Sequence, residues 1–260
     1  MERIIYMEKL KNFTHGMHIE RGVFNPNEIE KLRAAFYKTL SICTGIRNQL
    51  GVENGMENTV HHVLFMDDIF QELLEKDQNK KVLADFFDNK KYILNSLGGQ
   101  NNIKVNYARK IHRDVRFYSS EKLMLNAIWC VSPLNERTGA TQFMLGSHLK
   151  ANEPKKDEFE SNMITIKAGP GDIVYFDSRV WHRAGSPVEG ITERIIYTPI
   201  FSRPFIKSGF NYSSACQSMN SEATSEYIKQ LSSYFSDVPN SHEDWYNFPK
   251  RKFYMKDQDI

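Results

Sequence analysis

The most informative stretch for the fold is Lys110-Ile111-His112-Arg113-Asp114-Val115. Its histidine and its carboxylate are two residues apart, so in a β-strand both side chains would lie on the same face. Side chains placed in this way can occupy adjacent positions on one metal ion. His182 follows later in the chain and would complete a set of two imidazoles and one carboxylate. Such a set, with its opposite side open, is typical of non-heme Fe(II) oxygenases. We therefore predict a metal site made by His112, Asp114 and His182.

A histidine followed two residues later by an acidic residue occurs at two other places in the sequence. The surrounding sequence distinguishes these two pairs from His112 and Asp114. His18-Ile19-Glu20 lies just before a predicted helix and far from the predicted strands, and His242-Glu243-Asp244 has no histidine after it. We interpret both as solvated surface clusters. Only His112 and Asp114 are followed by strand-like runs, a turn, a second histidine and then an arginine.

Arg194 ends this ordered set and supplies a cation. Three protein ligands leave three positions on ferrous iron, of which an α-keto acid can fill two while O2 takes the last. The remote carboxylate of 2-oxoglutarate then needs an anchor, and a guanidinium binds a carboxylate through two parallel hydrogen bonds. Because His182 and Arg194 are expected on successive strands joined by one turn, we predict that Arg194 binds 2-oxoglutarate.

Two polar residues in predicted strands are further candidates for co-substrate binding. Asn126 stands in an apolar run, where a buried amide needs hydrogen-bond partners. Thr141 follows a turn at Gly139 and could face the interior of a barrel. Each has a structural alternative, a satisfied core amide for Asn126 and an ordinary β-branched strand residue for Thr141.

Composition narrows the class of protein. The 260 residues are 40% hydrophobic and 25% charged, as in ordinary globular proteins. The net charge of +2 is too small to favour nucleic acid or an anionic membrane, and no apolar run is long enough for a membrane span. Three scattered cysteines form neither a disulfide framework nor a zinc cluster, which favours the cytoplasm. We expect a small-molecule substrate as partner, with no nucleic acid and no membrane, and the sequence carries no signal for oligomeric state.

The pattern of apolar residues predicts a single domain over residues 1–260, in three parts. Residues 1–90 are expected to be helical, with helices over 25–41, 67–75 and 80–87. Short apolar runs separated by turns over 91–205 predict a mainly β fold with a jelly-roll core and flanking helices. Residues 206–260 are expected to form one helix over 221–235 and a surface tail.

Strands are expected over 92–97, 103–108, 110–118, 123–131, 140–145, 163–167, 173–176, 180–183 and 194–201. A turn is predicted at Gly98-Gly99 and a charged loop over 150–161.

Several segments together resemble the phytanoyl-CoA dioxygenase family of Fe(II)- and 2-oxoglutarate-dependent oxygenases, over about residues 90–205. These segments are Ile111-His112-Arg113-Asp114, Glu136 to Thr141 leading into Leu145-Gly146-Ser147-His148, Ala168-Gly169-Pro170-Gly171-Asp172 through Phe176-Asp177, Trp181-His182, and Arg194. Two features depart from the family pattern. Leu145 stands where the family usually has proline, and the interval from His182 to Arg194 is longer than expected.

The resemblance implies a double-stranded β-helix, a cupin-like jelly roll, with outer helices. It implies iron at His112, Asp114 and His182, with Arg194 on the C5 carboxylate of 2-oxoglutarate. It also implies decarboxylation of 2-oxoglutarate to succinate and CO2 coupled to oxidation of a substrate. Halogenases of this type have glycine or alanine in place of the carboxylate ligand. The presence of Asp114 therefore favours hydroxylation.

Two other functions stay open at this point. A cupin-type enzyme that does not use 2-oxoglutarate would usually have three histidines and a glutamate, and no third histidine here has suitable spacing. A non-catalytic binding barrel would be expected to lack a member of the triad. One sequence feature bears on the substrate. Four basic residues surround the first two ligands and could meet an anionic or polar molecule, namely Arg109, Lys110, Arg113 and Arg116. The loop over 150–161 and the tail after residue 202 are candidates for a lid.

Overall fold

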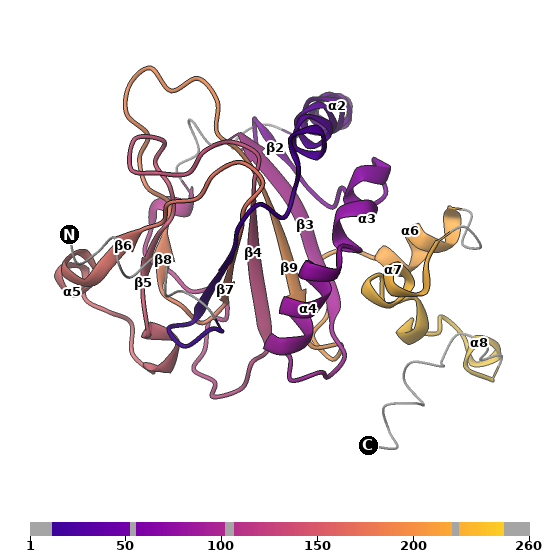
Figure 1. The fold of residues 1–260 in the computed structure, drawn as a ribbon. Coiled ribbons are helices and arrows are strands. Elements are labelled where there is room, and N and C mark those ends of the chain that lie inside the picture. Colours follow the sequence, from indigo (N-terminus) through magenta and orange to yellow (C-terminus); the bar gives the residue numbers. More distant parts are fainter. Residues whose placement is uncertain (1–11, 53–55, 102–106, 220–223, 247–260) are drawn as a thin grey trace.

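The computed structural model describes residues 12–52, 56–101, 107–219 and 224–246. Within these ranges, an antiparallel sheet of six strands packs against an antiparallel sheet of three strands (Figure 1). Helices cover the outer side of each sheet, and buried side chains from both sheets meet between them. The predicted mainly β fold with a jelly-roll core and flanking helices is confirmed.

The larger sheet has the strand order β1-β7-β4-β9-β3-β2. Its strands are β1 (Met17–Glu20), β2 (Thr59–Val60), β3 (Ile93–Asn101), β4 (Met124–Cys130), β7 (Ile173–Asp177) and β9 (Ile195–Ser202). The smaller sheet has the order β6-β5-β8, with β5 (Gln142–Met144), β6 (Met163–Thr165) and β8 (His182–Arg183). The central strand β4 is apolar along most of its length because both of its faces are covered.

Alternate side chains of β4 enter two different cores. Ala127 and Trp129 pack with the helices on the outer side of the large sheet, whereas Ile128 and Cys130 pack toward the small sheet. Since alternate residues of a strand share a face, Asn126 points toward the small sheet with Ile128. The space between the sheets is therefore where the polar residues of the large sheet can meet β8.

Helices form the layer outside the large sheet. They are α2 (Pro26–Leu50), α3 (Asp68–Leu74), α4 (Asp77–Phe86), α6 (Tyr212–Ser218) and α7 (Glu226–Leu231), and α8 (His242–Tyr246) follows them. Helix α5 (Lys156–Asn162) lies on the outer side of the small sheet instead. None of the helices in the described ranges combines the length and apolar character that a bilayer crossing requires.

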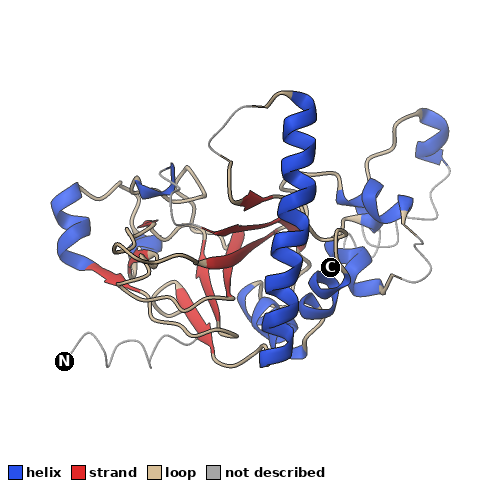
Figure 2. Cartoon of the chain, turned by 90° about the horizontal axis from the view of Figure 1, so that it is seen from above, coloured by secondary structure: helices blue, strands red, loops and turns tan. Residues whose placement is uncertain are grey.

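Helix α2 begins where the sequence predicts. The Asn25 side chain accepts a hydrogen bond from Glu28 N (3.0 Å), and the Glu28 carboxylate accepts one from Asn25 N (2.8 Å), which together form a capping box. The helix runs well past its predicted end at residue 41, to a left-handed cap at Gly51 (φ +63°). Its second half extends beyond the body of the protein, as the long helix of Figure 2 shows.

The predicted turn at Gly98-Gly99 is wrong, because β3 passes straight through both residues. The glycines instead admit close neighbours. A Cβ atom at Gly98 would lie 2.9 Å from Val60 O, and one at Gly99 would lie 2.6 Å from the Tyr197 ring. Glycine in a strand thus marks close approach here and not a reversal of the chain.

Other boundaries also differ from the predictions. His18 lies in strand β1, paired with Tyr175 of β7, and not apart from the strands. Most of the predicted strand over 103–108 lies outside the described residues, and its end is a 3₁₀ turn at Tyr107–Arg109. Residues 110–118 form only an isolated bridge at His112. Part of the predicted loop over 150–161 is helix α5, and the predicted helix over 221–235 is reduced to α7 in its described part.

Candidate metal centre

A backbone pair places the two histidines. His112 N donates to His182 O (3.0 Å) and His182 N donates to His112 O (2.8 Å), so the residues face each other across an antiparallel bridge. Side chains of such a pair leave the sheet on the same side. The imidazole centroids are accordingly 4.3 Å apart. On its other side, His182 pairs with Phe143 of β5, and its ring packs against the rings of Phe143 and Phe176.

Asp114 reaches the same point although its segment is not a strand. The amides of Asp114 and Val115 both donate to Ser178 O (2.9 and 3.1 Å). The strand pairing with β8 therefore ends directly after His112. Asp114 Oδ1 lies 3.8 Å from His112 Nε2, and Asp114 Oδ2 lies 3.8 Å from His182 Nε2. One ligand atom from each of the three residues lies within 4.8 Å of the others, a spacing at which they could hold one metal ion.

The hydrogen bonds of both histidines leave the nitrogen atoms that face Asp114 free to bind a metal. His112 Nδ1 donates to Lys110 O (2.7 Å) and His182 Nδ1 donates to Val180 O (2.9 Å). Because a carbonyl only accepts, each Nδ1 carries the proton and each Nε2 presents a lone pair. Burial lowers the pKa of His182, which keeps its ring neutral at neutral pH. Two imidazole nitrogens and one carboxylate are a ligand set that fits ferrous iron.

Asn126 fixes the orientation of the carboxylate. Its Nδ2 donates to Asp114 Oδ2, and its Oδ1 accepts a hydrogen bond from Ser178 Oγ (2.6 Å). The amide oxygen can accept only from Ser178, so the amide nitrogen is directed at Asp114. Sequence reasoning selected Asn126 for co-substrate binding and did not include Ser178. The only sequence signal for this contact is a polar side chain in an apolar strand.

Arg194 is buried between the sheets without a carboxylate partner among the described residues. It precedes Ile196 by two positions and therefore shares the face of β9 that looks toward the small sheet. Only 3% of the residue is exposed, and its Nη1 donates to Thr138 O (3.1 Å) and to Gly139 O. Its Nε has no partner in the described structure.

An unpaired buried cation is costly, so a site of this kind is suited to an anion. Burial, together with the charge of Arg109, lowers the pKa of Arg194 to about 10. The guanidinium therefore still carries its charge at neutral pH.

Thr141 shares a face with Phe143, and that face contains His182. Ile166 N donates to Thr141 O (3.1 Å), which continues the β5–β6 ladder by one bond. Strand alternation then directs the Thr141 side chain between the sheets. Its assignment to co-substrate binding stays a prediction.

Three other predicted candidates lie away from the open side of the triad. Arg113 is buried, with its guanidinium over the Trp181 ring (5.1 Å to the centroid) and Nη1 3.4 Å from Lys150 O. Helix α5 buries Phe159 against Trp181 on the outer face of the small sheet, so the described chain does not place this segment over the metal ligands. Helix α7 packs with the helical layer outside the large sheet. Helices α5 and α7 of the two candidate lids thus lie outside the barrel.

Comparison with known proteins agrees with this geometry. The profile of the family described as phytanoyl-CoA dioxygenase (PhyH) matches residues 14–187, which is more than half of the chain. The chain belongs to the phytanoyl-CoA dioxygenase family. This membership confirms the predicted family. It also confirms, as properties of the family, the predicted enzyme class and the cofactors Fe(II), 2-oxoglutarate and O2. The match includes all three residues of the triad, and Arg194 lies just beyond it.

Two curated relatives of this phytanoyl-CoA dioxygenase family member cover about half of it. The uncharacterized protein Rv1501 of Mycobacterium tuberculosis is 26% identical over 153 residues, or 58% of this chain and 56% of the relative. Dioxygenase af480 of Aspergillus fumigatus is 28% identical over 141 residues, or 50% of this chain and 46% of the relative. The chain thus aligns with about half the length of these relatives.

Two solved structures share the fold of this family member. AviO1 from Streptomyces viridochromogenes Tue57 superposes with a TM-score of 0.58 at 18% identity, over 78% of this chain and 96% of AviO1. SnoN from nogalamycin biosynthesis, described as a non-heme alpha ketoglutarate dependent epimerase, gives 0.55 at 18% identity, over 77% and 84%. At this identity, the likeness establishes the double-stranded β-helix and not the reaction.

Proposed function

We propose that this protein is an Fe(II)- and 2-oxoglutarate-dependent dioxygenase that hydroxylates a small molecule and releases succinate and CO2. One observation carries the proposal. Three ligand atoms converge between the sheets with both Nε2 atoms free, and Arg194, on the inner face of the large sheet, is buried without a carboxylate partner among the described residues. Family membership supports the same reaction class.

In this proposal, His112, Asp114 and His182 hold the iron. The bound metal supplies the redox chemistry that activates O2 and oxidises the substrate. The carbonyl groups of Lys110 and Val180 hold the two imidazole rings turned with Nε2 toward Asp114. Asn126 holds the carboxylate of Asp114 toward the histidines.

Arg194 would bind the remote carboxylate of 2-oxoglutarate. Its Nη1 is engaged by Thr138 O and Gly139 O, which fixes the plane of the guanidinium and leaves Nε for an incoming anion. A charge-assisted hydrogen bond is strong in such a buried place. Thr141 is the second candidate for contact with the co-substrate, and Asn126, through its second amide hydrogen, is the third.

Hydroxylation is the favoured outcome because the carboxylate ligand Asp114 is present. A small-molecule substrate fits a site that opens beside the triad, where the Asp114 side chain is 26% exposed and that of His112 is 21% exposed. Access from solvent on this side leaves the buried His182 and Arg194 on the inner wall.

The direct test is turnover of 2-oxoglutarate by the Fe(II)-loaded protein in the presence of O2. We expect succinate and CO2 in equal amounts, with loss of both in His112→Ala and in Arg194→Ala. Activity that needs Fe(II) but no keto acid, and that persists in Arg194→Ala, would instead indicate a cupin-type enzyme. Function that is unaltered when both His112 and Asp114 are replaced by alanine would indicate a binding barrel.

A further inference from the structure

The segment that follows Asp114 exposes three large side chains beside the metal ligands. Arg116, Phe117 and Tyr118 are exposed, with Phe117 at 61% and Tyr118 at 53%. Within the described structure, none of the three makes a hydrogen bond, an ion pair or a ring contact. Exposed aromatic groups next to an unpaired arginine are a surface suited to a ligand.

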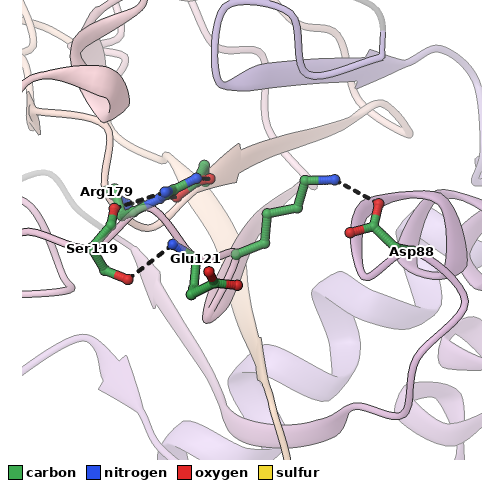
Figure 3. Close-up of polar contacts among 6 residues, drawn as sticks. Asp88, Ser119, Glu121 and Arg179 are labelled. Atoms are coloured by element: carbon green, nitrogen blue, oxygen red, sulfur yellow. Dashed lines mark hydrogen bonds and ion pairs between the residues drawn. The ribbon is translucent and has the colours of Figure 1, made fainter. Parts of the chain in front are cut away.

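Both ends of this exposed segment are fixed, so it is not a freely moving loop. On one side, Val115 is buried and its amide, like that of Asp114, donates to Ser178 O. On the other side, Arg179 Nη1 donates to Ser119 O (2.9 Å), and Glu121 N donates to Ser119 Oγ (3.0 Å), as Figure 3 shows.

The anchor at Ser119 is itself rigid. Arg179 is held by Asp177 through two buried hydrogen bonds, Nε to Oδ1 (2.9 Å) and Nη2 to Oδ2 (2.6 Å). Beyond it, Lys122 pairs with Asp88 (2.7 Å). The three exposed side chains therefore project from a backbone whose position relative to the triad is set.

The charges around the triad are unbalanced in favour of cations. Arg109, Lys110 and Arg116 are exposed and pair with no carboxylate among the described residues. Lys110 and Arg116 lie two residues from His112 and Asp114, and Arg109 is the neighbour of Lys110, so all three are near the site. Fe(II), Asp114, the two carboxylates of 2-oxoglutarate and Arg194 together carry no net charge. The three exposed cations therefore have no counter-charge from the loaded centre.

We propose that Arg116, Phe117 and Tyr118 form the recognition surface for the substrate, and that this substrate is an organic anion with an apolar body. The inference rests on the proposed function, because it places the substrate at the open side of the triad. Arg116, assisted by Arg109 and Lys110, binds a carboxylate or a phosphate group, and the two aromatic rings cover the apolar part. Arg113 takes no part, since it is buried against Trp181.

The test uses matched probes and a metal that reports distance without turnover. The protein is loaded with Mn²⁺ and 2-oxoglutarate, and Mn²⁺ binding is measured by electron paramagnetic resonance. The probes are 4-phenylbutyrate, 4-phenylbutyl phosphate and the neutral 4-phenylbutanamide. Broadening of their proton resonances by the bound Mn²⁺ gives both affinity and proximity. The two anions distinguish a carboxylate from a phosphate.

We expect at least one anion to bind about tenfold more tightly than the amide, the ratio that one charge-assisted contact supplies. Arg116→Gln is expected to remove this preference, and replacement of both Phe117 and Tyr118 by serine to weaken all probes equally. Lys156→Gln is the control, because Lys156 is exposed on α5, on the outer face of the small sheet. It is expected to keep the preference.

The outcomes separate the two proposals. If Mn²⁺ binds and no anion is preferred over the amide, or if Arg116→Gln keeps the preference, the recognition surface is disproved and the proposed function stands. If wild-type protein binds no Mn²⁺ at the triad, the function fails and the recognition surface fails with it. An anion that binds with the Arg116-dependent preference but whose resonances are not broadened by the bound Mn²⁺ would also overturn the proposal, because it would place the anion away from the centre.

Discussion

Asn126 on β4 donates a hydrogen bond from its carboxamide to the carboxylate of Asp114, across twelve positions of sequence. The contact depends on the pairing of β4 with β7, which brings Ser178 to the Asn126 carbonyl (2.6 Å) and fixes which end of the amide faces Asp114. The backbone carbonyl of Ser178 also accepts hydrogen bonds from the amides of Asp114 and Val115. One serine therefore sets both the main chain and the side chain of the proposed carboxylate ligand.

Removal of this hydrogen bond should weaken metal binding more than folding. We expect Asn126→Ala to raise the Kd for Mn²⁺ by about tenfold or more, because a metal ligand that loses its hydrogen-bonded support is less well oriented. Asn126→Asp should be worse, since two carboxylates would then face each other. Asn79→Ala is the control. Asn79 is also buried, but it bonds Tyr175 of β7 and Leu74 of α3 on the helical side of the large sheet. Equal metal affinity in Asn126→Ala and wild type would disprove this role.

Arg194 should determine affinity for 2-oxoglutarate and leave metal affinity unchanged. We expect Arg194→Ala to raise the Kd for 2-oxoglutarate by about 10- to 100-fold, from the loss of a charge-assisted pair in a buried site. Arg194→Lys keeps the charge but loses the planar fork and should recover only part of the affinity. Calorimetry with Mn²⁺-loaded protein measures both values. Unchanged affinity for the keto acid would contradict the assignment.

Gly139 links a backbone conformation to the position of Arg194. Its φ is +69°, its carbonyl accepts from Arg194, and a Cβ atom there would lie 2.4 Å from Pro187 N. Gly146 has a similar φ of +76° but open space around it. Both alanine variants carry the strain of a left-handed backbone, about 1 kcal/mol. Only Gly139→Ala should also weaken 2-oxoglutarate binding. Equal loss in both variants would refute the link.

Asp172 should stabilise the fold through the turn that joins β1 to α2. Its carboxylate accepts hydrogen bonds from Gly22 N (2.9 Å), Gly169 N (2.7 Å) and Arg21 (2.6 Å). We expect Asp172→Asn to lower the free energy of unfolding by about 1–3 kcal/mol, because an amide has only one accepting oxygen and its NH2 group would face at least one of the donors. Asp88→Asn, which breaks an exposed pair with Lys122, should cost at most about 1 kcal/mol. Urea denaturation measures the free energy of unfolding of both variants. A similar loss in the two would contradict the stabilising role of Asp172 in this turn.

The sequence predicts the elements whose signals are local. The capping box of Asn25 and Glu28, the apolar strand over 123–131 and the pair of His112 and Asp114 can all be read from neighbouring residues. The glycine pair at 98–99 misleads because the signal for a turn and the signal for close packing are the same residue. Its meaning depends on Tyr197 and Val60, which are distant in sequence.

The support of the site could not be predicted for the same physical reason. Lys110–Tyr118 has the composition of a strand, but Ser178 O accepts two successive amides and ends the ladder after one bridge. The partner of Asn126 depends on strand register, which a single sequence does not define. The separation of Arg113 from Arg116, one buried and one exposed, likewise follows from the position of Trp181.

The most direct test of the central claim is an anaerobic titration of the protein with Fe(II) and 2-oxoglutarate, followed by the visible charge-transfer absorption of the keto acid on ferrous iron. We predict saturation at one equivalent of each, with no absorption in His182→Ala and, in Arg194→Ala, absorption only at about 10- to 100-fold higher 2-oxoglutarate. A protein that binds no Fe(II), or a His182→Ala variant that develops the same absorption at the same stoichiometry, would contradict the account.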